Sequence, residues 1–186
     1  ERAVPSYVLS GLAPAEREVR REGFDEIKYL VERLDSGDRS SIDRLYMIAD
    51  QNEELREKLL TTILSSMGEK DDDAVIRRLR VVSRIFEKSR HLIDDHLPGI
   101  LDGFMGLSDR VKRELSSILT RYYGESEKLK EYVPKIVGNL IKSRNLNDRK
   151  IAIYMIEKLS SYDFKDYSSY LDDIIDLLNS GDPELK

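Results

Sequence analysis

The chain has 186 residues, a net charge of −5 at pH 7, 36% charged and 40% apolar residues, and no cysteine. This apolar content is sufficient for a packed core and argues against wholesale disorder, while the lack of cysteine excludes disulfides and thiolate metal sites. The acidic balance argues against a dedicated nucleic-acid binder, because phosphate contacts require excess Lys and Arg.

The first predicted element is a short charged helix that begins near Pro14, within an N-terminal segment over residues 1–23. After it comes a repeated pattern of four apolar residues at positions i, i+3, i+4 and i+7, which places them on one face of a helix. The first members of the five quartets are 33 to 38 residues apart, a near-constant spacing that predicts structural repeats. The quartets are Ile27, Leu30, Val31, Leu34; Leu60, Ile63, Leu64, Met67; Leu97, Ile100, Leu101, Phe104; Val133, Ile136, Val137, Leu140; and Leu171, Ile174, Ile175, Leu178.

A turn with an aspartate follows each quartet, and every turn but the last leads into a second amphipathic stretch. The aspartates are Asp38, Asp72, Asp109, Asp148 and Asp182. We predict that each is the N-cap of the following helix, because a carboxylate there accepts from the unpaired N–H groups of the first turn; the register of Asp72 is open by one residue. The preceding glycines, at 37, 68, 106 and 181, predict left-handed helix ends.

These hairpins divide residues 24–186 into repeats at 24–52, 53–89, 90–126 and 127–163, with a shortened fifth at 164–186. Asp182 and Pro183 form a strong helix start close to the last residue of the sequence. We therefore expect the natural protein to continue. We also expect weak self-association through the fifth repeat, because a terminal helix without its partner exposes an apolar face.

Two stretches carry a family resemblance: "HLPGILDGFMGLSDRVKREL" and "YVPKIVGNLI" each place a proline, Pro98 or Pro134, one residue after the first apolar member. This pattern, followed by an Asp turn and a basic second helix, resembles HEAT repeats. The resemblance implies an all-α fold, a right-handed α-α superhelix of about four and a half helical hairpins. It also implies a scaffold or adaptor that binds proteins, since most HEAT-repeat proteins do so and some bind nucleic acid.

The candidate binding residues form a basic stripe on two second helices. Four of them fall within about 80° on one helix and three lie in a similar arc on the next. They are Arg77, Arg80, Arg84, Lys88, Arg110, Arg113 and Arg121. The resemblance implies that second helices line a concave surface, where the stripe would receive an acidic or extended partner segment. The alternative is a solvated face with i, i+4 ion pairs.

No catalytic motif is recognisable in the sequence, and on a helix His91 and His96 would point about 140° apart, which disfavours a zinc site. We therefore predict a non-enzymatic interaction scaffold without cofactor or metal. Nucleic-acid binding is the alternative; a DNA-glycosylase-like enzyme ranks below it, because that HEAT-like family uses tryptophans and this chain has none.

No apolar run is long enough for a membrane helix, no signal-peptide pattern is seen, and the Glu, Lys and Arg content suits a thermophile. A cytoplasmic location is expected.

Overall fold

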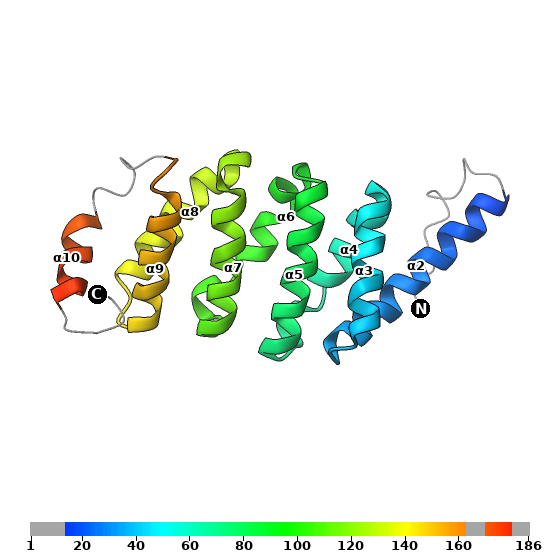
Figure 1. The fold of residues 1–186 in the computed structure, drawn as a ribbon, viewed down its shortest axis with the longest axis horizontal. Coiled ribbons are helices and arrows are strands. Elements are labelled where there is room, and N and C mark those ends of the chain that lie inside the picture. Colours follow the sequence, from blue (N-terminus) through cyan, green and yellow to red (C-terminus); the bar gives the residue numbers. More distant parts are fainter. Residues whose placement is uncertain (1–13, 163–169, 180–186) are drawn as a thin grey trace. The chain divides into compact units, whose positions relative to one another are not determined.

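A computed structural model describes residues 14–162 and 170–179, and over these ranges the chain forms helices and no strand (Figure 1). This confirms the prediction of an all-α protein. The α-helices of the described ranges are α2 (Pro14–Asp35), α3 (Arg39–Gln51), α4 (Glu53–Leu64), α5 (Asp72–Lys88), α6 (His91–Leu101), α7 (Asp109–Tyr122), α8 (Glu127–Ile141), α9 (Leu146–Leu159) and α10 (Leu171–Asn179). Short 3₁₀ turns follow three of them: η1 (Met67–Glu69), η2 (Phe104–Gly106) and η3 (Tyr123–Glu125).

The chain divides into two compact units, residues 1–89 and 90–186. In the first unit, α2 packs against α4 and α3 packs against α5, while α2 also contacts α3 and α4 contacts α5. In the second unit, α6 packs against α8 and α7 against α9, and α8 contacts both α7 and α9. Each unit therefore has two layers of helices, with successive helices alternating between the layers.

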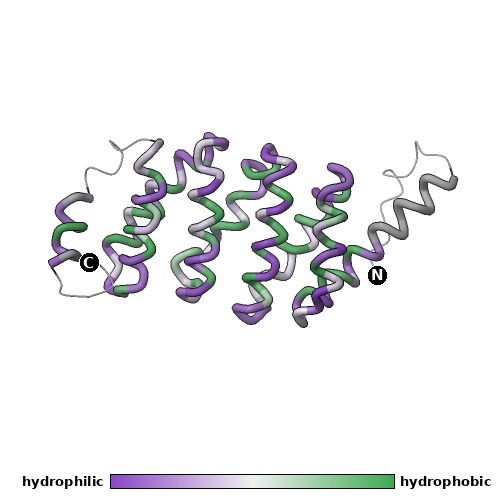
Figure 2. The backbone as a smooth tube through the Cα atoms, in the orientation of Figure 1, coloured by the Kyte–Doolittle hydropathy of each residue, from purple (hydrophilic) through white to green (hydrophobic). Residues whose placement is uncertain are grey.

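The core of each unit lies between its two layers and contains most of the predicted apolar residues. All four members of the first quartet are buried, from Ile27 to Leu34. The second, third and fourth quartets each bury two or three members and leave the remainder half-buried. Figure 2 shows the expected alternation of hydrophobic and hydrophilic segments along these amphipathic helices.

The fifth quartet differs from the others in the residues that can be described. Ile174 is half-buried and Ile175 is 51% exposed, whereas the side chains of Leu171 and Leu178 lie outside the described part. Self-association through α10 therefore stays a prediction. The predicted helix start at Asp182 and Pro183 also lies outside the described residues.

The N-terminal helix is longer than predicted. It begins at Pro14, as expected, but it continues without interruption to Asp35 and so includes the helix of the first quartet. The prediction of a separate short helix was therefore wrong. The residue between the two stretches is Gly23, and a single glycine costs a helix about 1 kcal/mol without forcing it to end.

Two predicted aspartate caps are wrong, and a third is shifted by the one residue that the sequence left open. That third cap, of α5, is Asp71 rather than Asp72, and its Oδ1 accepts from the backbone N of Ala74 at 2.8 Å. The N-cap of α7 is Ser108, and Asp109 is the first helical residue. The N-cap of α9 is Asn145, three residues before the predicted Asp148.

Asp38 does occupy the N-cap position of α3, but its carboxylate makes no capping bond to the backbone. Its Oδ2 instead accepts from Ser41 Oγ at 2.6 Å, from Arg33 Nε at 3.0 Å and from Ser40 Oγ at 3.0 Å. These three hydrogen bonds hold the pKa of Asp38 well below its usual range, and the bond from Ser41 has the largest effect. The polar side chains around the turn compete successfully with the helix N–H groups for this carboxylate.

The predicted left-handed glycines are partly confirmed. Gly37 has φ +80°, as expected for the end of α2, and Asp38 N then donates to Arg33 O. Gly68 and Gly106 do not adopt positive φ in the structure; Gly103 does, with φ +69°, in the turn after α6. Gly68 and Gly106 lie within the 3₁₀ turns η1 and η2, and a 3₁₀ turn has negative φ.

Candidate interaction surface

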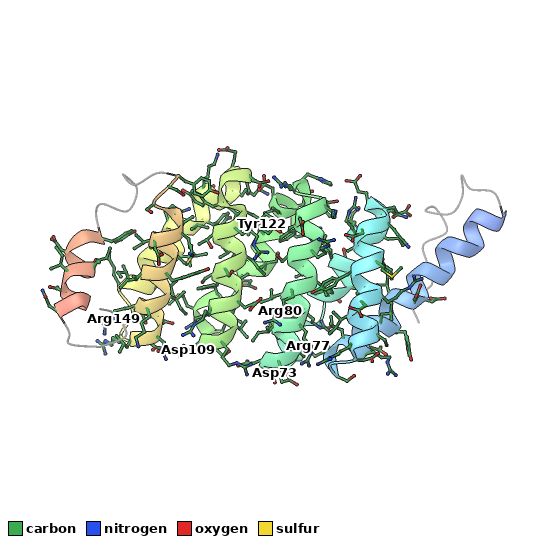
Figure 3. The ribbon with its side chains drawn as sticks, viewed as in Figure 1. Asp73, Arg77, Arg80, Asp109, Tyr122 and Arg149 are labelled. Carbon is green, nitrogen blue, oxygen red and sulfur yellow. The ribbon has the colours of Figure 1, made fainter. Side chains whose placement is uncertain are left out.

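Helix α5 carries four of the seven predicted basic residues, and the structure assigns them different roles. Its buried side includes Leu79, Val82 and Ile85, and the predicted stripe lies away from these residues. Arg80 and Lys88 are exposed, whereas Arg77 and Arg84 are partly buried. Figure 3 shows Arg77 and Arg80 projecting from this helix.

Arg77 holds the C-terminal end of α2 in place. Its Nε donates to the carbonyl oxygen of Leu34 at 2.9 Å, and its Nη2 donates to the carbonyl oxygen of Asp35. The last carbonyls of a helix have no partner within the helix, and a cation there also suits the negative end of the helix dipole. The guanidinium of Arg77 is therefore committed to an internal contact.

Arg84 links α5 to α3 through a two-pronged ion pair with Asp50. Its Nε and Nη2 donate to Asp50 Oδ1 and Oδ2 at 3.0 and 2.8 Å, and its Nη1 donates to Glu87 Oε2 at 2.9 Å. The hydrogen bonds from Arg84, and after them the positive charges of Arg84 and Lys88, lower the pKa of Asp50. Two carboxylates thus compensate the charge of Arg84, so the stripe is less basic than its sequence indicated.

Asp50 belongs to a stripe on α3 with the spacing i, i+3, i+4 and i+7. Asp43, Met47 and Asp50 are exposed there and Tyr46 is half-buried. Met47 has 54% of its surface exposed, which is high for an apolar residue on a packed helix. We define the α3/α5 face as Asp43, Tyr46, Met47 and Asp50 of α3 together with Arg80, Arg84 and Lys88 of α5.

The other three predicted residues lie on α7 in the second unit. Arg110, Arg113 and Arg121 are all exposed. The structure therefore gathers Arg80, Arg84 and Lys88 on one unit and these three arginines on the other.

Helix α5 also carries a buried arginine that the sequence interpretation missed. Arg78 is 2% exposed, and its Nε and Nη2 donate to the two carboxylate oxygens of Asp35 at 2.7 and 2.9 Å. Its Nη1 donates to Ile63 O at 2.8 Å and to Ser66 Oγ at 3.0 Å. Burial alone would raise the pKa of Asp35, but hydrogen bonds from Arg78 and Lys70 outweigh it and lower that pKa. This cluster joins α2, α4 and α5.

The second unit contains a similar buried pair between α7 and α9. Lys112 Nζ donates to Asp148 Oδ1 at 2.7 Å, and each side chain is only 5% exposed. Ser143 Oγ donates to the other oxygen of Asp148 at 2.7 Å. Asp148, predicted to be a cap, is therefore half of a buried ion pair. A charged residue inside an apolar arc, as Arg78 and Lys112 both are, was the sequence signal for these pairs.

No group of three or more His, Cys, Asp or Glu side chains in 14–162 and 170–179 is placed to hold a metal ion. Over the same stretches, none of the helices combines the length and the apolar character that a bilayer crossing needs. No protein-family model matches the chain, and a search of curated proteins finds no significant match.

Proposed function

We propose that this chain is a non-catalytic protein-interaction scaffold, built as a HEAT-like right-handed solenoid of about four and a half hairpins. The architecture is supported by the packing within each unit, where a helix contacts both the next helix and the one after it. The evenly spaced quartets support it too, because stacked hairpins bury such stripes against their neighbours. Binding would then be the task of the exposed helix faces.

The observation that carries the function is the α3/α5 face. Met47 is 54% exposed and lies next to Tyr46 on a stripe edged by charged residues. An apolar centre with a polar rim is typical of protein interfaces, and the flexible methionine side chain adapts to different partner shapes. We expect the partner to be an extended segment with one apolar residue for Met47 and an acidic residue for Lys88.

Nucleic-acid binding remains the second candidate, and the α3/α5 face weakens it. Asp43 and Asp50 are exposed within the face itself, so they would repel a phosphate backbone. Arg77 and Arg84 bind main-chain carbonyls and carboxylates of the protein. A protein segment of mixed character fits this surface better than a phosphate chain does.

The test begins with capture of partners by the full-length protein, followed by mass spectrometry with and without nuclease treatment. A partner that resists nuclease is then titrated against the wild type and against a Met47→Ser/Lys88→Glu double variant. The matched control is Lys28→Glu, a charge reversal of an exposed residue on α2 in the other layer of the same unit.

We expect the double variant to bind more weakly, mainly through slower association, and the difference to shrink at high salt because screening removes the electrostatic contribution. The control should bind like the wild type. Unchanged affinity and salt dependence in the double variant would rule out the α3/α5 face. Loss of every partner after nuclease treatment would favour nucleic-acid binding instead.

A further inference from the structure

The second unit contains an open groove of about 460 Å³ between the end of α6, the following turn and α8. Its apolar lining includes Pro98, Leu101, Phe104, Met105, Tyr132 and Ile136. Phe104 is buried at 4% exposure, whereas Met105 is 38% exposed at the edge. The groove therefore has a fixed aromatic floor and an accessible apolar rim.

One wall of the groove is a single stripe of α8. Tyr132, Lys135, Ile136 and Asn139 line the groove with the spacing i, i+3, i+4 and i+7, which places them on one side of the helix. These residues extend along about 10 Å of the helix, at 1.5 Å per residue. A wall of this length is matched to three or four residues of an extended peptide, at about 3.3 Å each.

The two charged residues of the lining are not equivalent. Lys135 Nζ lies 2.9 Å from Glu131 Oε1 and 5.4 Å from the centre of the Tyr132 ring, so its charge already has a partner. Asp102 is exposed, and within residues 14–162 and 170–179 no basic side chain forms an ion pair with it. It is also the C-cap of α6, where the helix dipole adds partial negative charge. This end of the groove is therefore electronegative.

Gly99 adds a second observation on the same part of α6. It lies inside the helix next to Pro98, and a Cβ added to it would meet no atom within 4 Å beyond its chain neighbours and the backbone of its own helix. A glycine there costs the helix about 1 kcal/mol relative to alanine, and no internal contact accounts for it. Pro98 and Gly99 together form an exposed surface with little side chain, which a partner backbone can approach closely.

We propose that this groove binds a peptide segment of a protein partner in which aliphatic residues flank a lysine or arginine. The aliphatic side chains would cover Phe104 and Ile136, and the basic residue would pair with Asp102 at the end of α6. Charge complementarity selects this occupant, because the one uncompensated charge of the lining is negative. The site lies within the second unit and shares no residue with the α3/α5 face. The two proposals can therefore be tested independently.

The experiment uses the whole chain, labelled with ¹⁵N, and three capped hexapeptides as probes. The first carries three leucines around one arginine, the second has glutamate in place of the arginine, and the third has serines in place of the leucines. Amide shifts are followed during titration to millimolar peptide. We expect the first peptide to shift the amides of residues 99–106 and of residues 132–139 other than Pro134, which has no N–H. We also expect it to bind at least threefold more tightly than either of the others.

Variants then separate charge from apolar contact. Asp102→Lys should lower the affinity for the arginine peptide at least about two- to fivefold, since a charge near a helix end contributes on that scale. Asp95→Lys is the matched control: Asp95 is an exposed acid of the same helix outside the lining, and its change should have little effect.

Ile136→Ser should abolish binding, and Met105→Ser, on the exposed rim, serves as a second variant should Ile136→Ser fail to fold. The proposal is overturned if the arginine peptide shifts no groove amide. Equal binding of the glutamate peptide, or equal effects of Asp102→Lys and Asp95→Lys, would overturn it as well.

Discussion

Replacing Arg78 with alanine should destabilise the protein far more than replacing Arg84 of the same helix. The change removes a 2%-exposed guanidinium that binds both oxygens of Asp35, the carbonyl of Ile63 and the hydroxyl of Ser66. It removes the guanidinium donor from a partly buried carboxylate, which keeps Lys70, and from a helix-end carbonyl. Such uncompensated groups, rather than the lost contacts alone, determine the cost.

The expected loss is about 3 kcal/mol. Breaking a buried ion pair by removing one partner costs about 3–5 kcal/mol, and the lower end applies because Lys70 Nζ stays 3.0 Å from Asp35 Oδ2. Arg84→Ala is the matched control: the ion pairs of Arg84 are half exposed, so its loss should lie close to the experimental error. Arg78→Lys should fall between the two, because an ammonium cannot reproduce the planar fork.

The assay is equilibrium unfolding in urea, monitored by helical circular dichroism at 222 nm, with the slope m compared between variants so that changes in ΔG are not confused with changes in cooperativity. The reasoning is refuted if Arg78→Ala loses less than about 1 kcal/mol, or no more than Arg84→Ala does, since breaking a buried ion pair should cost at least about 3 kcal/mol. Either result would mean that water or a rearranged side chain replaces the missing donor.

Three further predictions concern other groups. Asp148→Ala should lower the free energy of unfolding by about 3–5 kcal/mol, because it leaves the buried ammonium of Lys112 without its carboxylate. In urea unfolding, a Lys112→Met/Asp148→Ala double variant should lose clearly less stability than the sum of the two single changes. Additive losses would contradict the pairing. Gly138→Ala should change the near-ultraviolet circular dichroism, which tyrosine dominates in a chain without tryptophan, because the new Cβ would lie 2.6 Å from the Tyr170 hydroxyl; an unchanged spectrum would show that this contact does not form. The pKa of Asp35 is lowered on folding, so its ionised carboxylate stabilises the fold fully above the unfolded pKa of about 3.9, and this stabilisation is lost as the pH falls through the folded pKa. Below about pH 4 the free energy of unfolding of the wild type should therefore fall faster than that of Asp35→Asn. Parallel plots of this free energy against pH in acid would disprove the assignment.

Much of the helical framework was predictable because it depends on a periodic signal. The quartets repeat at the spacing of a helical face, and from Ile27 to Leu140 their members are buried or half-buried. The helix ends were harder to place, because they depend on competition between neighbouring polar groups. Asp38 binds serine hydroxyls instead of helix N–H groups, and Ser108 and Asn145 cap their helices in place of the aspartates that follow them.

The candidate site was less predictable than the fold, because sequence alone does not show which charges are paired. Arg77 and Arg78 are adjacent in the chain, yet the first binds main-chain carbonyls and the second is buried against Asp35. Periodicity placed Arg77 on an open face, since it contains no information about the end of α2. The partner carboxylate of Arg78 lies 43 residues earlier, a separation beyond the reach of any local pattern.

The division after Ser89 has a consequence for how the molecule responds to damage. Each unit contains its own core and its own buried ion pair, Arg78 with Asp35 before the division and Lys112 with Asp148 after it. Local opening in proteins follows such cooperative segments. Replacing Arg78 with alanine should therefore speed amide hydrogen exchange over residues 25–88 and leave residues 91–159 protected. The chain would then act as two separately melting units, each able to open while the other stays folded.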